Sequence, residues 1–407
     1  MTANRMFRYS IACAALGMVL FGCGKSAPPS YPTWATAPQP TAIQANSSNA
    51  FDAYRQAALD AEEKGQKYLT RVSFFPGHRK IAAELTQSAF VRVIQATGRE
   101  SEFKFTPTRP FEQRPFHRGW RLLGRVFAWK IEDACKAEDY ANAVMLANAG
   151  SKFGFDLTGG AAMDAALGLD IVDQIRIAIA PHLTKMKPEQ LSALASGMTS
   201  ALGRKVPLTT TLTNEEQNFK LAVQTVQDLY RANDLKKLED ELGPSGREAV
   251  EKLKAAGKKS DEARLQYFSG FANEASESVH HYVELASLPV AKREAKLEFS
   301  RNRAWRGFAK IFLGTLEPLL SHDDATTART RLVILQAKLL AGKKNGYPSS
   351  LKYISQELDK DPYSGERFLY HYDASQFTLY SVGPNLKDDG GETDGTFSDP
   401  DLLLEQG

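Results

Sequence analysis

The sequence predicts a mainly α-helical body followed by a small α+β domain, in which a helix packs on a short antiparallel sheet. Apolar residues recur at the 3.6-residue helical period over residues 50–322. Turn residues and two short strand-like runs then follow between 346 and 382. Since 407 residues exceed the length of one small domain, we expect more than one folded part.

Composition excludes several protein classes. The chain is 43% hydrophobic and 24% charged, an ordinary globular mixture that excludes wholesale disorder. A mean hydropathy of −0.36 excludes a protein with many membrane spans. The formal net charge is only +3, and we predict no nucleic-acid partner because no strong positive field would attract one.

Residues 1–22 have the features of a signal peptide. Arg5 and Arg8 precede a short apolar run at 9–21, which is too short to span a bilayer. The run ends in Leu20-Phe21-Gly22-Cys23, which resembles the lipobox of bacterial lipoproteins. The resemblance implies cleavage before Cys23, lipidation of its thiol, and a membrane partner held through the acyl chains. An ordinary secretory signal is the alternative, and both predict an extracytoplasmic protein, at a periplasmic face or the cell surface.

Residues 23–49 are rich in proline, serine, alanine and threonine. This composition is typical of an extended, semi-stiff linker, so we expect a tether between Cys23 and the folded body. Cys13 leaves with the signal and Cys23 is acylated, so Cys135 remains as a single thiol without an intrachain partner. Cys135 lies in a helical pattern and is predicted to be a small buried residue.

The helical body, residues 50–322, begins with a predicted cap at Ser48 or Asn49. Helices are expected at 118–136 and again from Tyr140, separated by an acidic turn. This hairpin, near 118–153, resembles one tetratricopeptide-type unit, but no second copy occurs at a 34-residue period. Residues 243–261 are charged and glycine-punctuated, which favours an exposed excursion. A further apolar stripe runs from Trp305 to Leu319.

The C-terminal part, residues 323–407, contains several turn and strand signatures in order. A helix is expected to start after His322-Asp323-Asp324, followed by Gly-Tyr-Pro-Ser-Ser-Leu at 346–351, a short helix to Leu358, and Asp-Pro-Tyr-Ser-Gly at 361–365. Strands are predicted at 368–372 and 377–382, before an acidic loop. Over about 325–401 this order resembles the globular domain of the major pseudopilin of type II secretion systems. The resemblance implies the fold of a helix on a sheet, but the leader here is a lipoprotein signal.

The pseudopilin resemblance also implies calcium in the final loop. Calcium prefers six to eight oxygen ligands from a flexible loop, and Glu392 and Asp401 are among the acids available there. The predicted calcium ligands are Ser381, Asn385, Asp388, Asp389, Asp394 and Asp399. A solvated acidic tail that folds without metal is the alternative.

Catalytic motifs are sparse. The sequence contains no H-E-x-x-H, no C-x-x-C and no G-x-S-x-G. Glu277, His281 and Glu284 share one helical face, which would suit a metal or a solvated polar surface. A basic, aromatic stretch from Arg109 to Arg125 would suit either acidic lipid or arginine stems that cover apolar surface.

These patterns favour a membrane-anchored lipoprotein with a non-enzymatic binding or scaffolding role among cell-envelope proteins. One alternative is an accessory component of a type II secretion or pilus-like system, which would contact pseudopilins through the C-terminal domain. The second alternative is a hydrolase whose site lies in the helical body, around Glu277, His281 and Glu284. No small-molecule ligand follows from the sequence.

Overall fold

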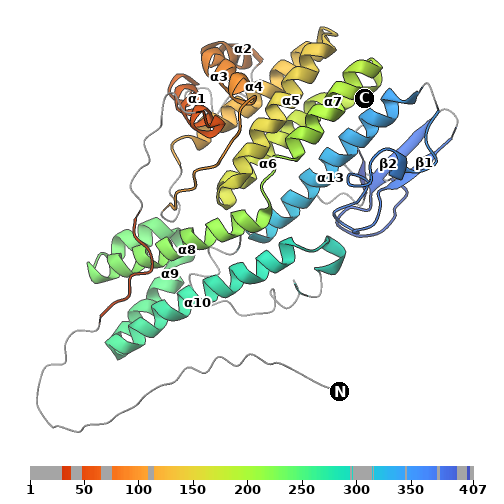
Figure 1. Ribbon diagram of the computed structural model, residues 1–407. Helices are drawn as coiled ribbons and strands as arrows, with labels where there is room; N and C mark the ends of the chain where they lie inside the picture. The colour runs from red at the N-terminus through yellow and green to blue at the C-terminus, as the bar shows by residue number, and fades with distance from the viewer. Residues whose placement is uncertain are drawn as a thin grey trace, which may run out of the picture. The chain divides into compact units, whose positions relative to one another are not determined.

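The computed structural model describes residues 30–37, 48–65, 76–108, 114–293, 296, 314, 316–343, 346–373, 376–391 and 401–403. Of these, the residues from Thr33 onward belong to one compact unit. The protein is mainly helical, with a short antiparallel sheet near the C-terminus (Figure 1). This confirms the fold class that the sequence predicts.

The helices and strands follow the chain in a simple order. The helices are α1 (Ala50–Gly65), α2 (Pro76–Leu85), α3 (Gln87–Ala96), α4 (His117–Lys136), α5 (Tyr140–Asp156), η2 (Leu157–Gly159), α6 (Ala162–Ile179), η3 (Ala180–Lys185), α7 (Pro188–Leu202), α8 (Leu208–Arg231), α9 (Leu235–Lys259), α10 (Asp261–Ala286), η4 (Val290–Lys292), α13 (Leu316–Ala341) and η6 (Leu351–Tyr353). The strands are β1 (Leu369–Tyr372), β2 (Phe377–Ser381) and β3 (Leu402–Leu403).

Helix α1 starts at the predicted cap and lies very close to α4. The side-chain oxygen of Asn49 accepts the N–H of Phe51 at 3.0 Å, which satisfies one of the free donors of the first turn. Gly119 of α4 faces α1 without a side chain, and a Cβ there would lie 1.9 Å from the carbonyl oxygen of Ala58. Trp120 is fully buried beside it, and its ring N–H donates to the carbonyl of Tyr54 at 3.0 Å. The two helices therefore meet backbone to backbone.

Helices α4 and α5 form the hairpin that the sequence predicts. The turn between them places Glu138 at a positive φ of 58°. Asp139 then caps α5 by accepting the N–H of Asn142 at 3.2 Å. Helix α6 packs on both α4 and α5, and α7 packs on α5.

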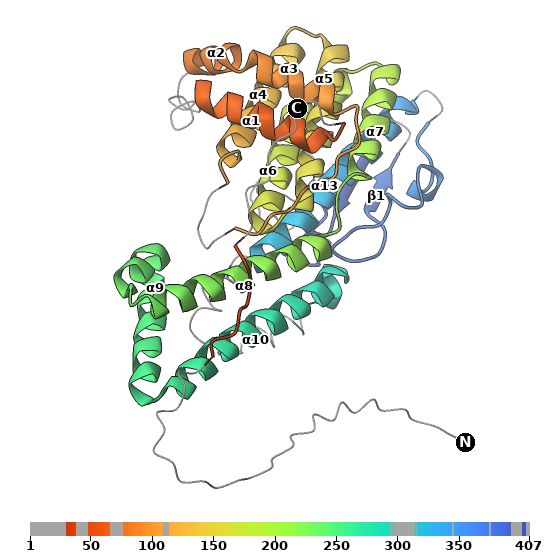
Figure 2. The same cartoon turned by 60° about the vertical axis from the view of Figure 1, so that its left-hand side comes forward.

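Helix α13 lies at the centre of the packing. It contacts α6 and α7 on one side and β2 and β3 on the other (Figures 1 and 2). Its four consecutive residues Leu332–Leu335 are all fully buried. This part of the helix is apolar on every side because it has no solvent-exposed face.

The start of α13 differs from the sequence expectation. His322, Asp323 and Asp324 were expected to precede the helix, but α13 begins at Leu316 and includes them. The expectation is wrong because these polar residues find ionic partners across the helix contacts and need no turn. The predicted boundary between 322 and 323 thus falls inside one helix. The stripe from Trp305 to Phe312 lies outside the described residues.

Helices α8, α9 and α10 pack against one another, and α8 and α10 run side by side in both views (Figures 1 and 2). The expected excursion at 243–261 is wrong, since α9 is a helix through Lys259. Its residues Leu238, Val250 and Leu253 are buried, so burial of an apolar stripe outweighs the low helix propensity of glycine and proline. Gly257 sits where a Cβ would come within 2.4 Å of the Tyr230 hydroxyl.

The sheet has the order β1-β2-β3, and both pairs are antiparallel. In the hairpin Tyr370 pairs with Leu379, and Tyr372 with Phe377, so these four side chains share one face. The two-residue β3 was not expected from the sequence and pairs with the end of β2. One other expectation is wrong: the short helix predicted before Leu358 is only the 3-10 turn η6.

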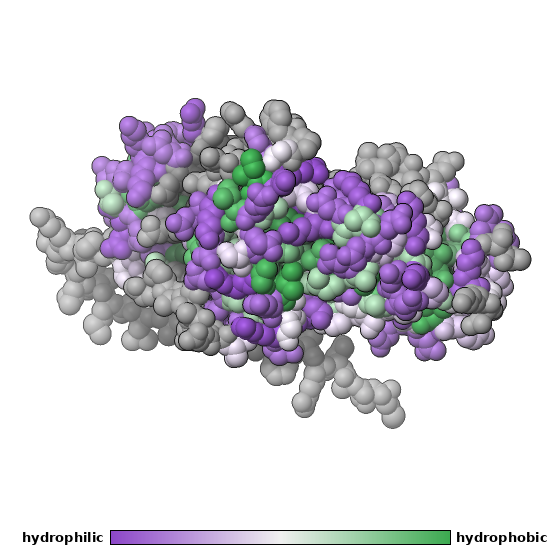
Figure 3. Space-filling model, turned by 90° about the horizontal axis from the view of Figure 1, so that it is seen from above, coloured by the Kyte–Doolittle hydropathy of each residue, from purple (hydrophilic) through white to green (hydrophobic). Residues whose placement is uncertain are grey.

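Exposed apolar side chains are scattered. On the face drawn in Figure 3, hydrophobic residues form separate patches among hydrophilic ones. Among the described residues, no helix is both long enough and apolar enough to span a bilayer.

Because α1 and α4 lie so close together, we expect alanine to change the free energy of unfolding in opposite directions at Gly119 and at Gly270. Gly119→Ala forces a Cβ into the backbone of Ala58, and we expect it to lower the free energy of unfolding by about 3 kcal/mol. Gly270→Ala in α10 is the control, because nothing lies within 4 Å of its Cβ position. Alanine there should raise stability by about 0.5–1 kcal/mol. Urea unfolding measures both, and equal effects of the two variants would contradict the close α1–α4 contact.

Candidate functional site

A groove crosses helices α3, α5 and α7. It encloses about 520 Å³, a volume within the range of ligand pockets. Its wall is mostly apolar and includes Ile94 of α3, Val144, Met145 and Ala149 of α5, and Ala193 of α7. Met145 is 46% exposed, which is high for a large apolar side chain in the middle of a helix. The groove thus presents apolar surface to an external molecule.

The groove also contains polar groups. The side-chain N–H of Asn148 donates to the carbonyl of Ala193 at 3.2 Å, which joins α5 to α7. The other amide atom, Oδ1, is buried and has no hydrogen-bond partner. A buried acceptor without a donor costs about 1–3 kcal/mol, so a ligand that supplies an N–H would be stabilised there. Lys152 adds a positive charge to the same wall.

Gly197 explains why the amide of Asn148 is held in this position. A Cβ at residue 197 would lie 2.1 Å from the side chain of Asn148. Since glycine leaves this space empty, the amide reaches across to α7. The sequence did not predict this contact, because an asparagine within a helical pattern gives no indication of its hydrogen-bond partner.

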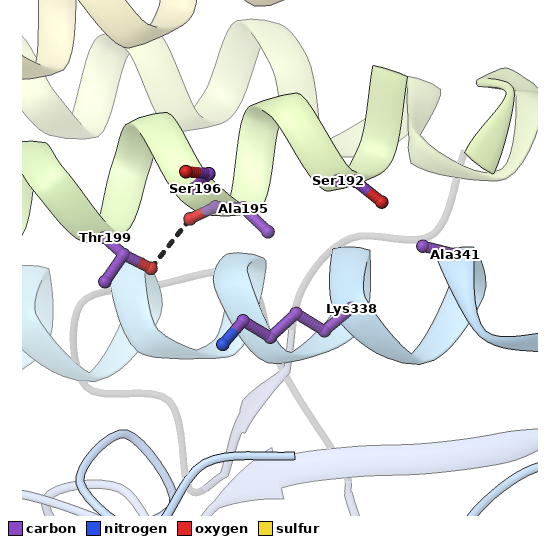
Figure 4. A pocket seen from close by; sticks show the side chains of 6 residues that line it. All are labelled: Ser192, Ala195, Ser196, Thr199, Lys338 and Ala341. Carbon is purple, nitrogen blue, oxygen red and sulfur yellow. Dashed lines mark hydrogen bonds between the residues drawn. The ribbon is translucent and has the colours of Figure 1, made fainter. Parts of the chain in front are cut away.

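A second, smaller groove lies between α7 and α13 and encloses about 400 Å³. Figure 4 shows its lining: Ser192, Ala195, Ser196, Thr199, Lys338 and Ala341. The Lys338 side chain extends along α13 toward Thr199, whose hydroxyl donates to the carbonyl of Ala195 at 2.7 Å. The smaller groove therefore lies where α7 packs on α13, and the larger groove lies where α7 packs on α5. The larger groove has the more apolar wall.

Buried ionic contacts fasten the first half of α13 to α6. The ring Nε2 of His322 lies 3.3 Å from a carboxylate oxygen of Asp173 and 3.7 Å from Asp170. Thr326 donates its hydroxyl to Asp173 at 3.0 Å. Burial opposes the charged form of His322, but Asp173, Asp170 and Asp323 outweigh it and raise the pKa of the imidazole.

Two further pairs join α13 to neighbouring segments. Lys205 contacts Asp323 at 2.7 Å, and Arg293 makes a two-point ion pair with Asp324, one bond of which is 3.1 Å. Burial raises the pKa of Asp324 to about 6, against the opposing effect of Arg293. All these groups are paired with one another inside the fold, so we assign them a structural role.

The structure places four of the predicted calcium ligands; Asp394 and Asp399 lie outside the described residues. Ser381 is fully buried, and its hydroxyl donates to Asp361 at 2.8 Å. The hydroxyl therefore stabilises the 361–365 turn through Asp361.

The other described ligands lie in one loop. Asn385 donates to Asp389 at 2.6 Å, and Tyr380 donates to Asp388 at 2.8 Å. Within the described residues, no three histidine, cysteine or carboxylate side chains gather as a metal-binding group.

Asp401, which is not among the six predicted calcium ligands, closes the loop. It is fully buried, and one carboxylate oxygen accepts the N–H groups of Asp389 and Gly391 at 3.0 and 2.7 Å. Its other oxygen, Oδ1, is buried and has no partner. Burial raises the pKa of Asp401, and the charges of Asp389 and Asp388 act in the same direction. An orphaned carboxylate oxygen beside acidic neighbours fits a hard cation.

The three residues of the predicted helical face on α10, Glu277, His281 and Glu284, differ in burial. Glu277 and Glu284 are exposed on α10, while the Nε2 atom of His281 is buried without a hydrogen-bond partner. These three do not form a metal-binding group in the described structure. Cys135 is buried as predicted, and burial raises its pKa to about 11, which suppresses thiolate chemistry.

The basic, aromatic stretch is divided between the interior and the surface. Arg109 and Phe111 lie outside the described residues. Arg114 is buried and contacts Asp164 at 3.1 Å, and the ring of Trp120 lies in the core. Arg118 and Arg121 are exposed, so the part of the stretch on α4 contributes both core side chains and surface cations.

The raised pKa of His322 predicts a pH-dependent stability. Its contribution is fully present below the unfolded pKa of about 6.5 and is lost as the pH rises through the higher folded value. Between about pH 6 and about pH 9 the wild type should therefore lose more unfolding free energy than His322→Gln. Urea unfolding at both pH values measures this difference.

The matched control is His280→Gln, an exposed histidine on α10. It should keep the wild-type pH dependence, while Asp324 titrates alike in all three proteins. An unchanged pH dependence in His322→Gln would show that the α6–α13 contact does not involve the imidazolium.

No protein-family model matches the chain, no curated protein matches it, and no solved structure matches it. The lipoprotein-signal, hairpin and pseudopilin resemblances therefore rest on the residues that carry them.

Proposed function

We propose that the protein is an extracytoplasmic lipoprotein, anchored through acylated Cys23, that binds another cell-envelope protein without catalysis. The observation that supports this most directly is the groove across α3, α5 and α7. It combines an open apolar wall around Met145 with an unsatisfied buried acceptor on Asn148 and a cation on Lys152.

These groups suit a polypeptide segment. Apolar side chains of the partner would cover Met145 and Val144, and a backbone or side-chain N–H would donate to Asn148 Oδ1. A carboxylate of the partner would pair with Lys152. These four side chains all lie on α5, which packs on α4, α6 and α7, so little backbone freedom is lost on binding.

A secretion-linked accessory role is the second candidate, and the C-terminal region supports it. A helix, a turn at 361–365 and a hairpin follow in the order that the pseudopilin resemblance implies. Since α13 is covered on both sides, contact with a pseudopilin would use the hairpin, where Tyr372 is 46% exposed.

We also propose that calcium binds the loop after β2. Asp401 Oδ1 and the carboxylates of Asp388 and Asp389 would bind the calcium ion, and the ion would neutralise part of their negative charge. Ser381 is left out because its hydroxyl is engaged by Asp361.

The anchor is tested with Cys23→Ala. Removal of the thiol removes the acyl chains, and we expect the protein to move from the membrane fraction to the soluble fraction. Cys135→Ala is the control and should stay membrane-bound. Fractionation with mass spectrometry of the N-terminal peptide measures this. Membrane retention of Cys23→Ala, or an N-terminal peptide without acyl chains, would exclude the lipid anchor.

The groove is tested with Met145→Glu in the full-length lipoprotein, purified with its partners from its own membranes. A charge in the apolar wall should reduce recovery of a specific partner by about tenfold, which corresponds to about 1.4 kcal/mol. Met163→Glu is the matched control, because Met163 is an equally large side chain, 60% exposed on α6, outside the groove.

Equal recovery with the two methionine variants would exclude the groove as the binding surface. Recovery of pseudopilins or a secretin that is lost with a calcium chelator would instead favour the secretion-linked role and the calcium site together.

A further inference from the structure

Trp34 is clamped onto α8. Its backbone N–H donates to the side-chain oxygen of Gln224 at 2.8 Å, and its ring N–H donates to the side-chain oxygen of Gln227 at 3.1 Å. Gln227 is fully buried, and Gln224 is held in turn by Asp228, to which it donates at 2.9 Å. Because one tryptophan satisfies two glutamines one turn apart, this contact fixes both the position and the direction of the chain.

The clamp interrupts the segment that the sequence predicts to be a spacer along its whole length from 23 to 49. Residues 33–37 consist of small residues apart from Trp34, which is held at a fixed point on α8.

The clamp shortens the distance available between the lipid and the body. Trp34 follows Cys23 by 11 residues, which span at most about 36–40 Å when fully extended. Asn49, where α1 is capped, follows Cys23 by 26 residues, which would span at most about 86–94 Å. Helix α10 alone, with 26 residues, is about 39 Å long. With the clamp closed, the leash is therefore no longer than one helix of the body.

We infer that the Trp34 clamp makes the α8–α10 helices the membrane-facing side of the protein, and that their partner is the headgroup surface of the bilayer holding Cys23. This inference rests on the proposed lipidation of Cys23. The 11 residues from Cys23 to Trp34 hold the clamped part of α8, at Gln224 and Gln227, within about 40 Å of the bilayer, whatever path they take.

The charges on α9 suit this partner. Exposed lysines occur at both of its ends, Lys236 and Lys237 in the first turn and Lys258 and Lys259 in the last. Lysines near an anionic lipid surface each contribute favourably to binding. Exposed acids reduce the effect: Asp240 near the first pair, Glu251 in the middle of α9, and Asp261 and Glu262 next to the second pair.

The orientation has a consequence for the groove. Both views place α8–α10 at the end of the molecule opposite to α2 and α3 (Figures 1 and 2). With α8–α10 toward the lipid, the groove across α3, α5 and α7 is directed away from the membrane, where an envelope partner can reach it.

Energy transfer to the membrane tests the inference on the full-length lipidated protein. The protein is reconstituted in vesicles of phosphatidylethanolamine and phosphatidylglycerol that contain a headgroup-labelled acceptor lipid. A donor dye is attached through Asp240→Cys on α9 or, as the matched control, through Lys80→Cys on α2; both positions are exposed. Cys135 is buried and its raised pKa keeps it unreactive toward the dye.

We expect strong transfer from position 240 and weak transfer from position 80. Trp34→Ala should lose most of the transfer from position 240, because the leash then extends to Asn49. A second variant keeps the clamp and doubles the 11-residue leash with glycine and serine inserted between Ser26 and Ala27. It should lose transfer to a similar extent, independently of any effect of Trp34 on folding.

Equal transfer from the two positions in the wild type, or unchanged transfer in both variants, would overturn the inference alone. Failure of the wild type to float with the vesicles would overturn the lipid anchor, and this inference with it.

Discussion

Helix α13 is covered by α6 and α7 on one side and by the sheet on the other, so each polar group on it needs a partner inside the protein. His322, Asp323 and Asp324 meet this requirement through Asp173, Lys205 and Arg293. Each of these partners comes from a different segment. The pairing of one helix thereby fixes the positions of α6, of the segment after α7 and of the segment after α10.

The position of α7 follows from the same constraint and creates the grooves. It packs on α13 through one side and on α5 through the other, and the small side chains of Ala195 and Gly197 allow close approach. Where the packing leaves space, it exposes Met145 and the unpaired amide oxygen of Asn148. Function is thus assigned to the places where core packing is incomplete, whereas the strongly charged clusters are structural.

The sequence predicted the elements well where the signal was local. The helical stripe at 118–136, the turn at 137–139 and the hairpin at 368–382 depend on neighbouring residues, and the structure contains all three. The expectations at 243–261 and at 322–324 failed for one reason. Glycine, proline and charged residues indicate a break only when the tertiary environment does not stabilise a helix there. Burial of Leu238, Val250 and Leu253 stabilises α9, and ion pairs stabilise the first half of α13.

The candidate site was less accessible from the sequence. Asn148 and Trp34 lie in unremarkable local patterns, and their roles depend on Ala193 and Gln227, which are distant in the chain. The acidic loop was proposed to bind calcium because of a resemblance. That resemblance did not indicate the buried oxygen of Asp401 or the hydrogen bond from Ser381 to Asp361. Burial and hydrogen-bond pairing depend on which segments pack together, so they cannot be predicted from one segment of the sequence.

The sequence by itself determined the helical class and the helix-then-hairpin order, because period and turn chemistry act over a few residues. It also supplied the signal and lipidation prediction, which depends on adjacent residues in the same way. Only the tertiary structure decided that α13 is shared by the body and the sheet, that its charges are internal, and that Trp34 is fixed to α8. These features arise from contacts between residues far apart in the chain, whose free energy depends on how the helices pack.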